Sequence, residues 1–290
     1  MLNNDERRAK LCFTKLAIAL FLYELIFQMG TSLFYRIGTD IFADPYLDMI
    51  LAAVLAQLSA VLILGTESPK LSHKHFRPRS FVWLLLLFYG LQFVASLLTD
   101  PLESLLHNQG YALENAANAA AGTEPLTFLM LLYSVLLAPL FEELLFRGLL
   151  FNQLRRYGRC FAILITALLF GLMHTNVLQL IAAVLLGLLL AWIRECYGLP
   201  YAILLHISNN ALAILFNNFH SSTLVGMASL LIMLLGLIAL LHTLRRHGRE
   251  ILSILKAEAT LGHTLSLFFT SIGVVIVIIV FLLLAMLNLS

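Results

Sequence analysis

The sequence predicts an all-α protein, a polytopic transmembrane helical bundle of about nine spans, with eight as the lower count. Two observations predict this fold class. Of the 290 residues, 61% are hydrophobic and only 12% are charged, whereas soluble domains are typically about half apolar and a quarter charged. Apolar stretches of about 20 residues, enough for one helical crossing of a bilayer, also recur along the whole chain. Apolar side chains in such excess must face lipid.

The predicted spans follow one another from the first residues to the last. The first begins after a basic segment, but it is longer than a signal-peptide core and lacks a small-residue cleavage site, so we expect it to remain uncleaved. The fifth and sixth segments follow each other so closely that the count of nine depends on whether they form two separate spans. The nine segments are 11–34, 46–65, 81–99, 126–150, 161–175, 177–195, 199–218, 222–243 and 265–288.

Basic residues alternate between the connections, which predicts the topology. The positive-inside rule places loops rich in Lys and Arg in the cytoplasm. The odd-numbered loops together hold only Arg36, and the third, residues 100–124, is acidic with an Ala/Asn-rich stretch that could form a surface helix. We therefore expect a cytoplasmic N-terminus and an external C-terminus. The basic segments contain Arg7, Arg8, Lys10, Lys70, Lys74, Arg77, Arg79, Arg155, Arg156, Arg159, Arg194, Arg245, Arg246, Arg249 and Lys256.

Nothing in the sequence divides the chain. No internal repeat or Pro-rich linker is visible, so residues 1–290 are interpreted as one membrane domain whose partner is the lipid bilayer. The net charge of +2 is too small to predict a nucleic-acid partner. The three cysteines show no paired spacing, which indicates neither disulfides nor a thiolate metal site.

Ionisable residues inside the spans form a short list of functional candidates, because burying them in a bilayer is costly. The densest group is Pro-Leu-Phe-Glu-Glu-Leu-Leu-Phe-Arg-Gly at 139–148, with two adjacent carboxylates and an arginine in an apolar helix. Asn210 follows one of the histidines by one helical turn. The candidates are Glu24, Glu142, Glu143, Arg147, His174 and His206.

Helical spacing gives the two adjacent carboxylates different roles. Residues four apart share a face, so Glu143 can pair with Arg147, whereas Glu142 points about 100° away. The simplest alternative is one structural ion-pair cluster for both acids. We favour the structural role for Glu143 and Arg147, and a role as general base for Glu142.

The remaining polar candidates lie on other spans. His206 and Asn210 share one face of the seventh span, and His174 ends the fifth. A single membrane histidine is more often an interhelical hydrogen-bonding residue than a catalyst, but here two histidines and a carboxylate occupy three spans that can converge on one pocket. Glu24 could line a substrate gate, but an interhelical hydrogen bond to a glutamine such as Gln28 or Gln57 is the expected role.

The motifs Glu142-Glu143-x-x-x-Arg147, Phe170-x-x-x-His174 and His206-x-x-x-Asn210 together resemble the CPBP family, the CAAX proteases and bacteriocin-processing enzymes also called Abi. The resemblance covers about residues 125–218, the expected catalytic core. It implies a glutamate-dependent intramembrane endopeptidase. In that reading Glu142 with His174 activates a water, His206 with Asn210 stabilises the oxyanion, and Glu143, Arg147 and Phe170 support them.

The resemblance leaves cofactor and substrate open. The family is often labelled a metalloprotease, and His174 and His206 with Glu142 could ligate zinc, although there is no His-Glu-x-x-His helix. If a metal binds, Glu142 cannot easily be both ligand and base. The expected substrate is a membrane-associated peptide or protein, either of the prenylated CAAX type or a processed peptide.

Two other function classes compete with the protease. A non-catalytic scaffold or bacteriocin-immunity protein could use the same fold to bind a partner. A proton- or ion-coupled transporter would also explain buried Glu and His residues, but no pair of repeat halves with matching interrupted helices is visible.

Overall fold

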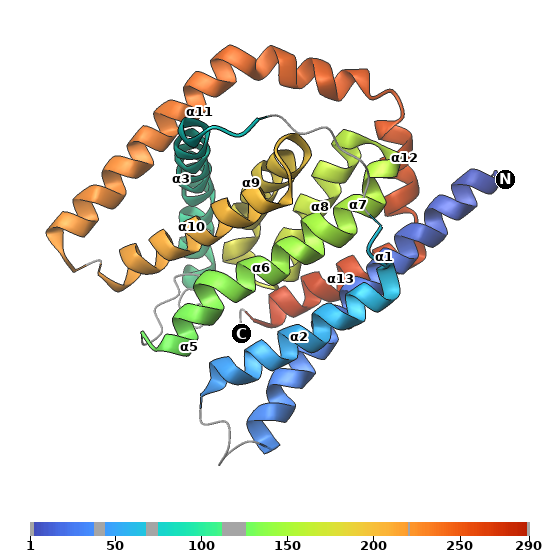
Figure 1. The fold of residues 1–290 in the computed structure, drawn as a ribbon, viewed down its shortest axis with the longest axis horizontal. Coiled ribbons are helices and arrows are strands. Elements are labelled where there is room, and N and C mark those ends of the chain that lie inside the picture. The colour runs from blue at the N-terminus through green and yellow to red at the C-terminus, as the bar shows by residue number, and fades with distance from the viewer. Residues whose placement is uncertain (1–2, 38–43, 68–74, 112–125, 220, 289–290) are drawn as a thin grey trace.

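The computed structural model describes residues 3–37, 44–67, 75–111, 126–219 and 221–288, which are entirely helical and irregular, without strands. This confirms the predicted all-α bundle. The chain begins with two long helices, α1 (Asn4–Ile37) and α2 (Pro45–Leu64), which lie against each other (Figure 1). Asp44 caps α2 by accepting a hydrogen bond from the backbone N–H of Tyr46, at 2.9 Å.

Helix α3 (Pro78–Asn108) packs against α11 (Thr223–Ala257), which arcs over the outside of the bundle (Figure 1). Gly90 and Gly236 make this contact possible, because a Cβ on Gly90 would clash with the carbonyl of Gly236. Small residues of this kind let membrane helices approach closely.

The fourth predicted span is one helical run, Phe128–Tyr157, with two π-helical segments. Pro139 stands where the first π segment gives way to α-helix; it lacks the N–H that a regular helix would use at that position. Single π turns are frequent at functional sites. In order, the run contains α5 (Phe128–Leu131), η1 (Leu132–Leu137), α6 (Ala138–Glu143), η2 (Leu144–Leu150), α7 (Phe151–Leu154) and the 3₁₀ turn η3 (Arg155–Tyr157).

The next three helices form the second half of the core. They are α8 (Arg159–Met173), α9 (Val177–Cys196) and α10 (Leu199–Asn218). The chain closes with α12 (Leu261–Phe269) and α13 (Ile272–Leu287), which are bent by 71° relative to each other and pack on α1 and α8.

Over the described residues, seven helices are long and apolar enough to cross a membrane, and the bent α12–α13 pair makes eight if it is one span. The fifth predicted span corresponds to α8, whose 15 residues reach only about 22 Å, against a hydrocarbon core of about 30 Å. Eight of the nine predicted spans, the bent pair included, therefore have a helix long and apolar enough to cross, and α8 is the one that is shorter than the membrane core.

Two helices extend beyond their predicted bounds. Helix α3 continues through Pro101 to Asn108, so the first part of the predicted 100–124 loop is helical. The Ala/Asn-rich stretch of that loop lies outside the described residues. Helix α11 continues past residue 243 to Ala257, because its basic segment is built mostly from good helix formers.

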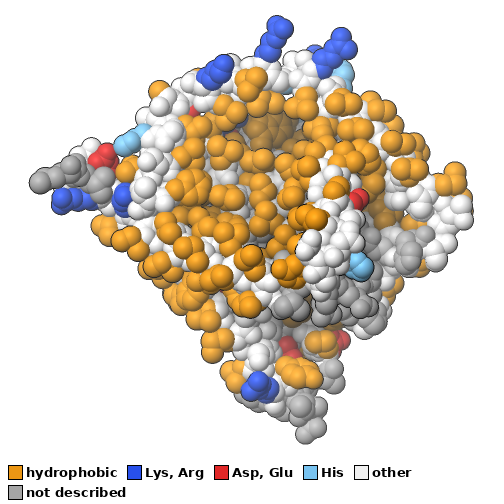
Figure 2. Space-filling model, turned by 180° about the vertical axis from the view of Figure 1, so that it is seen from behind, with side chains coloured by type: hydrophobic (Ala, Val, Ile, Leu, Met, Phe, Trp, Pro, Cys, Tyr) orange, Lys and Arg blue, Asp and Glu red, His pale blue; other side chains and the backbone are white. Residues whose placement is uncertain are grey.

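Apolar side chains cover most of the molecular face in Figure 2, with Lys and Arg gathered at its margins. Leu62, Leu224 and Ile272 are each more than three quarters exposed. An apolar surface this wide marks contact with a nonaqueous environment. Together with the long apolar helices, it identifies a multi-pass membrane protein.

Candidate active site

Glu142 and Glu143 end α6, between the two π segments, and they have different surroundings. The Glu143 side chain is 0% exposed, whereas that of Glu142 is 24% exposed. Because adjacent helical residues point about 100° apart, one carboxylate faces the packed interior and the other reaches open space.

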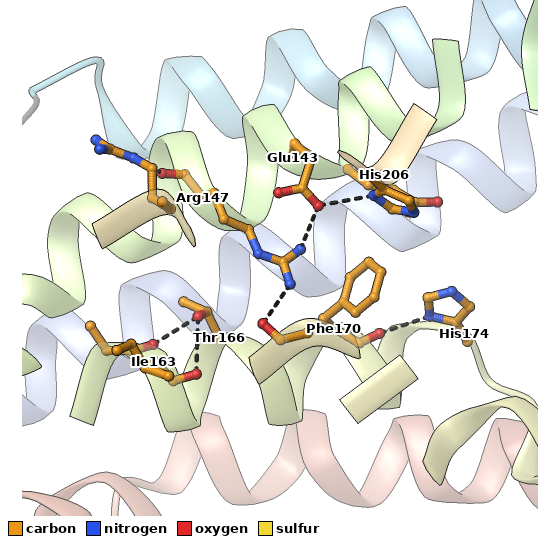
Figure 3. A network of polar contacts seen from close by, with 11 residues as sticks. Glu143, Arg147, Ile163, Thr166, Phe170, His174 and His206 are labelled. Atoms are coloured by element: carbon orange, nitrogen blue, oxygen red, sulfur yellow. Dashed lines mark hydrogen bonds and ion pairs between the residues drawn. The ribbon is translucent and has the colours of Figure 1, made fainter. Parts of the chain in front are cut away.

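Glu143 and Arg147 form the ion pair predicted from their spacing, with Nη1 of Arg147 2.8 Å from Oε1 of Glu143. The Arg147 side chain is also 0% exposed, and its Nη2 donates to the carbonyl of Gly187 at 3.0 Å. Its guanidinium lies 4.6 Å from the centre of the Phe170 ring (Figure 3). A buried charge needs partners of this kind, so Arg147 is fixed by α6, α8 and α9 together.

His206 of α10 lies between the two glutamates. Its Nδ1 is 3.0 Å from Oε1 of Glu143, and its Nε2 is 3.7 Å from Oε2 of Glu142. The first distance is a hydrogen bond and the second is too long for one. Since an ionised carboxylate only accepts, Nδ1 of His206 carries a proton and Nε2 points toward Glu142.

His174 caps the C-terminal end of α8, with Nδ1 2.8 Å from the carbonyl oxygen of Phe170. A carbonyl cannot donate, so this nitrogen is protonated and Nε2 of the neutral ring keeps its lone pair. The Phe170 ring lies edge-on to both imidazoles, with ring centres 4.8 Å from His174 and 5.9 Å from His206. Phe170 therefore holds the two histidines in place from the side (Figure 3).

The residue after His174 has a strained backbone. Thr175 has φ +45°, the only positive φ of a non-glycine residue in the described part of the chain. A β-branched residue rarely adopts this conformation, and such strain is found mainly at functional sites. The side-chain amide of Asn288, directly after α13, donates to the Thr175 carbonyl at 2.8 Å. The final helix thus holds the turn that carries His174.

Asn210 lies at the end of a chain of amides. Its Nδ2 donates to the carbonyl of Ser134 in η1 at 3.0 Å, and its Oδ1 accepts from Asn209 at 3.3 Å. Asn209 in turn accepts from Gln92 of α3 at 3.1 Å. Because an amide nitrogen carries two hydrogens, Asn210 keeps one donor for another acceptor.

A cavity of about 170 Å³ opens beside these residues. Glu142 and His174 line it, together with Tyr133 and the strained Thr175. Its opposite wall comes from α1, through Tyr23, Glu24, Phe27 and Gln28. His206 and Asn210 are not among the lining residues; His206 reaches the cavity wall only through its approach to Glu142.

In the described ranges, no group of three or more His, Cys, Asp and Glu side chains is arranged to hold a metal ion. The predicted zinc ligands His174 and His206 each use Nδ1 in a protein hydrogen bond. Only the Nε2 atom of each ring is therefore left to coordinate a metal. As arranged, these residues do not form the three-ligand set of a catalytic zinc site.

The structure brings together Glu142, Glu143, Arg147, His174 and His206, which are predicted from the sequence, and adds neighbours that the sequence does not indicate. The Glu143–His206 hydrogen bond joins residues 63 positions apart, which no helical spacing reveals. Tyr23 and Tyr133 gave no signal because aromatic residues in apolar helices are usually packing residues. Glu24 was noted, and its expected hydrogen bond to Gln28 is present at 2.8 Å, within one helix rather than between two.

Comparison with known proteins gives one match. Residues 124–212 match the family model described as type II CAAX prenyl endopeptidase Rce1-like, which confirms the resemblance to CAAX proteases. The description does not name bacteriocin processing. No curated protein and no solved structure matches the chain. The matched segment ends within α10, at residue 212, and includes both glutamates and both histidines.

Proposed function

We propose, from the match of residues 124–212 to the family model of Rce1-like CAAX prenyl endopeptidases, that this chain is a glutamate-dependent intramembrane endopeptidase. Its catalytic core is residues 125–218 of one membrane domain, and its substrate is a membrane-associated protein or peptide. One observation carries the proposal: of two adjacent glutamates, only Glu142 is partly exposed, and it lines a cavity with His174.

The proposed reaction begins with a water held between Glu142 and Nε2 of His174. Glu142 accepts a proton from this water as its oxygen attacks the carbonyl carbon of the scissile peptide bond. The carbonyl oxygen becomes an oxyanion. The proton on Glu142 then passes to the departing amide nitrogen, the C–N bond breaks, and an acid and an amine result.

The oxyanion needs hydrogen-bond donors aimed at it in a site that excludes bulk water. The remaining amide hydrogen of Asn210 is one donor. His206 becomes a second when its ring carries both protons, so that Nε2 donates. The carboxylate of Glu143 at Nδ1 balances the charge of that ring, and Arg147 holds the carboxylate in position.

The proposed orientation keeps the N-terminus in the cytoplasm and the C-terminus outside. Contacts among the basic connections support it. Gln153 donates to the carbonyl of Leu64 at 3.1 Å, and Arg155 forms a two-point ion pair with Glu195. Glu258, just after α11, accepts from the backbone N–H of Cys160 at 2.7 Å. The second, fourth, sixth and eighth connections thus meet at one end of the bundle, as the positive-inside rule requires.

The test is cleavage of quenched fluorescent peptides and of a prenylated CAAX peptide by purified protein in detergent. Wild type should cleave, and Glu142→Ala should be folded but inactive. A chelator added in parallel decides the zinc hypothesis: loss of activity that zinc restores would establish a metal. Absence of wild-type cleavage across all substrates would overturn the protease and favour the non-catalytic scaffold.

A further inference from the structure

Helix α1 lies outside the family-matched segment, yet it builds one wall of the cavity that holds Glu142 and His174. Glu24 is the polar group on that wall, and it is only 7% exposed. The reaction proposed above does not use it. Burying an acid inside a membrane span costs free energy, and such residues usually have a function. Because Glu24 lines the cavity, we expect its function there.

Gln28 fixes Glu24 in place. Its Nε2 donates to Oε1 of Glu24 at 2.8 Å, one helical turn further along α1. The Gln28 side chain is exposed, whereas Glu24 is buried, and both line the cavity. The pair therefore runs from the mouth of the cavity to its interior. In the described part of the chain, no hydrogen bond to Oε2 of Glu24 is recorded, so this oxygen can accept one from a ligand.

Among the described residues, the carboxylates that line the cavity have no basic side chain beside them on its wall. Glu24 and Glu142 both line it, and no described Lys or Arg does. Arg147 of the neighbouring ion pair is fully buried and already bound to Glu143 and Gly187. In a site of low dielectric, two acids without a cation attract a positive group and repel a carboxylate.

The size of the cavity limits the occupant. A volume of about 170 Å³ equals the share of five or six water molecules at about 30 Å³ each. This is room for one substrate side chain beside the reacting water.

We propose that Glu24, positioned by Gln28, is a specificity-determining residue that receives a lysine or arginine side chain of the substrate next to the scissile bond. This inference rests on the proposed function for its location at a cleavage site. The basic side chain enters past Gln28 and ends with its N–H groups on Oε2 of Glu24. A charge-assisted hydrogen bond of this kind is among the stronger ones.

The test uses otherwise identical neutral peptides in which one lysine is moved along the chain, each with a methionine and a glutamate counterpart. Binding is measured by fluorescence anisotropy and cleavage by kcat/KM, on the same detergent-purified protein. At one position near the scissile bond, wild type should prefer lysine over methionine by about tenfold or more, with glutamate disfavoured. Glu24→Gln should remove most of that preference in both binding and cleavage.

Asp48→Asn is the matched control, because Asp48 is a buried acid of α2 that does not line the cavity. It should keep the preference for lysine. Equal binding of the lysine, methionine and glutamate peptides by wild type overturns the inference, and so does an unchanged preference in Glu24→Gln. If wild type prefers lysine in binding through Glu24 but cleaves no peptide, the binding of a basic side chain by Glu24 stands and the proposed protease is overturned instead.

Discussion

The two neighbouring glutamates of α6 occupy two contrasting regions. Around Glu143 the side chains are sealed: Arg147 is 0% exposed, His206 only 8%, and each has a charged or hydrogen-bonded partner. Around Glu142 lies a cavity with a polar wall from a distant helix and a strained turn beside His174. In the sealed region most polar atoms bind one another, and only Oε2 of Glu143 and Nε of Arg147 are buried without a hydrogen-bond partner among the described residues. In the open region the polar groups remain available for a ligand.

The contrast separates structure from chemistry within a single dipeptide. A buried ion pair contributes little net stability relative to apolar packing. Removing only one of its partners, however, is strongly destabilising, because the other charge stays buried. An open carboxylate contributes little to folding, so its removal should affect only the reaction. The following variants test this separation, from the largest expected effect to the smallest.

Arg147→Ala should lower the unfolding free energy by about 3–5 kcal/mol, because it leaves Glu143 charged, buried and without its main partner. Denaturant titration in mixed micelles measures this. The double variant Glu143→Leu with Arg147→Met should recover a large part of the loss, since it removes both charges. A loss in Arg147→Ala of no more than about 1 kcal/mol, as for an exposed pair, would contradict the sealed environment.

Asn210→Ala should reduce kcat by about 10²–10³-fold, the usual cost of one lost oxyanion donor, with little change in KM. His206→Ala should lose at least as much. Asn209→Ala is the control, because Asn209 contacts Asn210 but acts only through it. It should reduce kcat much less. Equal losses in the two asparagine variants would show that Asn210 is not a donor to the substrate.

Asn288→Ala should cost about 1 kcal/mol of stability, the net worth of one hydrogen bond, and should also lower kcat several-fold. The reason is that Asn288 holds the carbonyl of Thr175, next to His174. Asn218→Ala removes a similar bond, to Ile214 at 3.1 Å, at a helix end away from the cavity. That control should lose stability alone. If both variants keep full kcat, the final helix does not position His174.

Thr175→Gly should raise the unfolding free energy by about 0.5–1 kcal/mol, because glycine adopts a positive φ without the cost paid by a β-branched residue. Thermal unfolding followed by circular dichroism is sufficient. Thr166→Gly, in the regular interior of α8, should have the opposite sign and lose stability. A destabilised Thr175→Gly would mean that the side chain, and not the backbone, determines stability at this turn.

The sequence was informative where the signal is local. Composition and recurrent apolar stretches predicted the bundle, and the four-residue spacing predicted the Glu143–Arg147 pair and the separate direction of Glu142. Three motifs predicted the family. Each of these follows from helix geometry or from residues close together in the chain.

What could not be predicted depends on packing between distant segments. The cavity is lined by residues of α1, which carries Glu24, together with residues of α6 and α8. Asn288 binds Thr175, which lies 113 positions away in the chain. The π segments and the positive φ of Thr175 arise from local strain that no apolar pattern encodes. The short length of α8 could not be predicted, because its 15 residues are as apolar as those of its neighbours.

The most direct test of the account compares Glu142→Gln with Glu143→Gln in the same assays of peptide hydrolysis and unfolding. Glu142→Gln should lose about 10²–10⁴-fold in kcat, the range for a missing general base, while its unfolding free energy stays within about 1 kcal/mol of wild type. Glu143→Gln should be destabilised by several times more, because Arg147 then remains buried without a counter-charge. Hydrolysis retained in Glu142→Gln, or full stability in Glu143→Gln, would contradict the division of roles between the two glutamates.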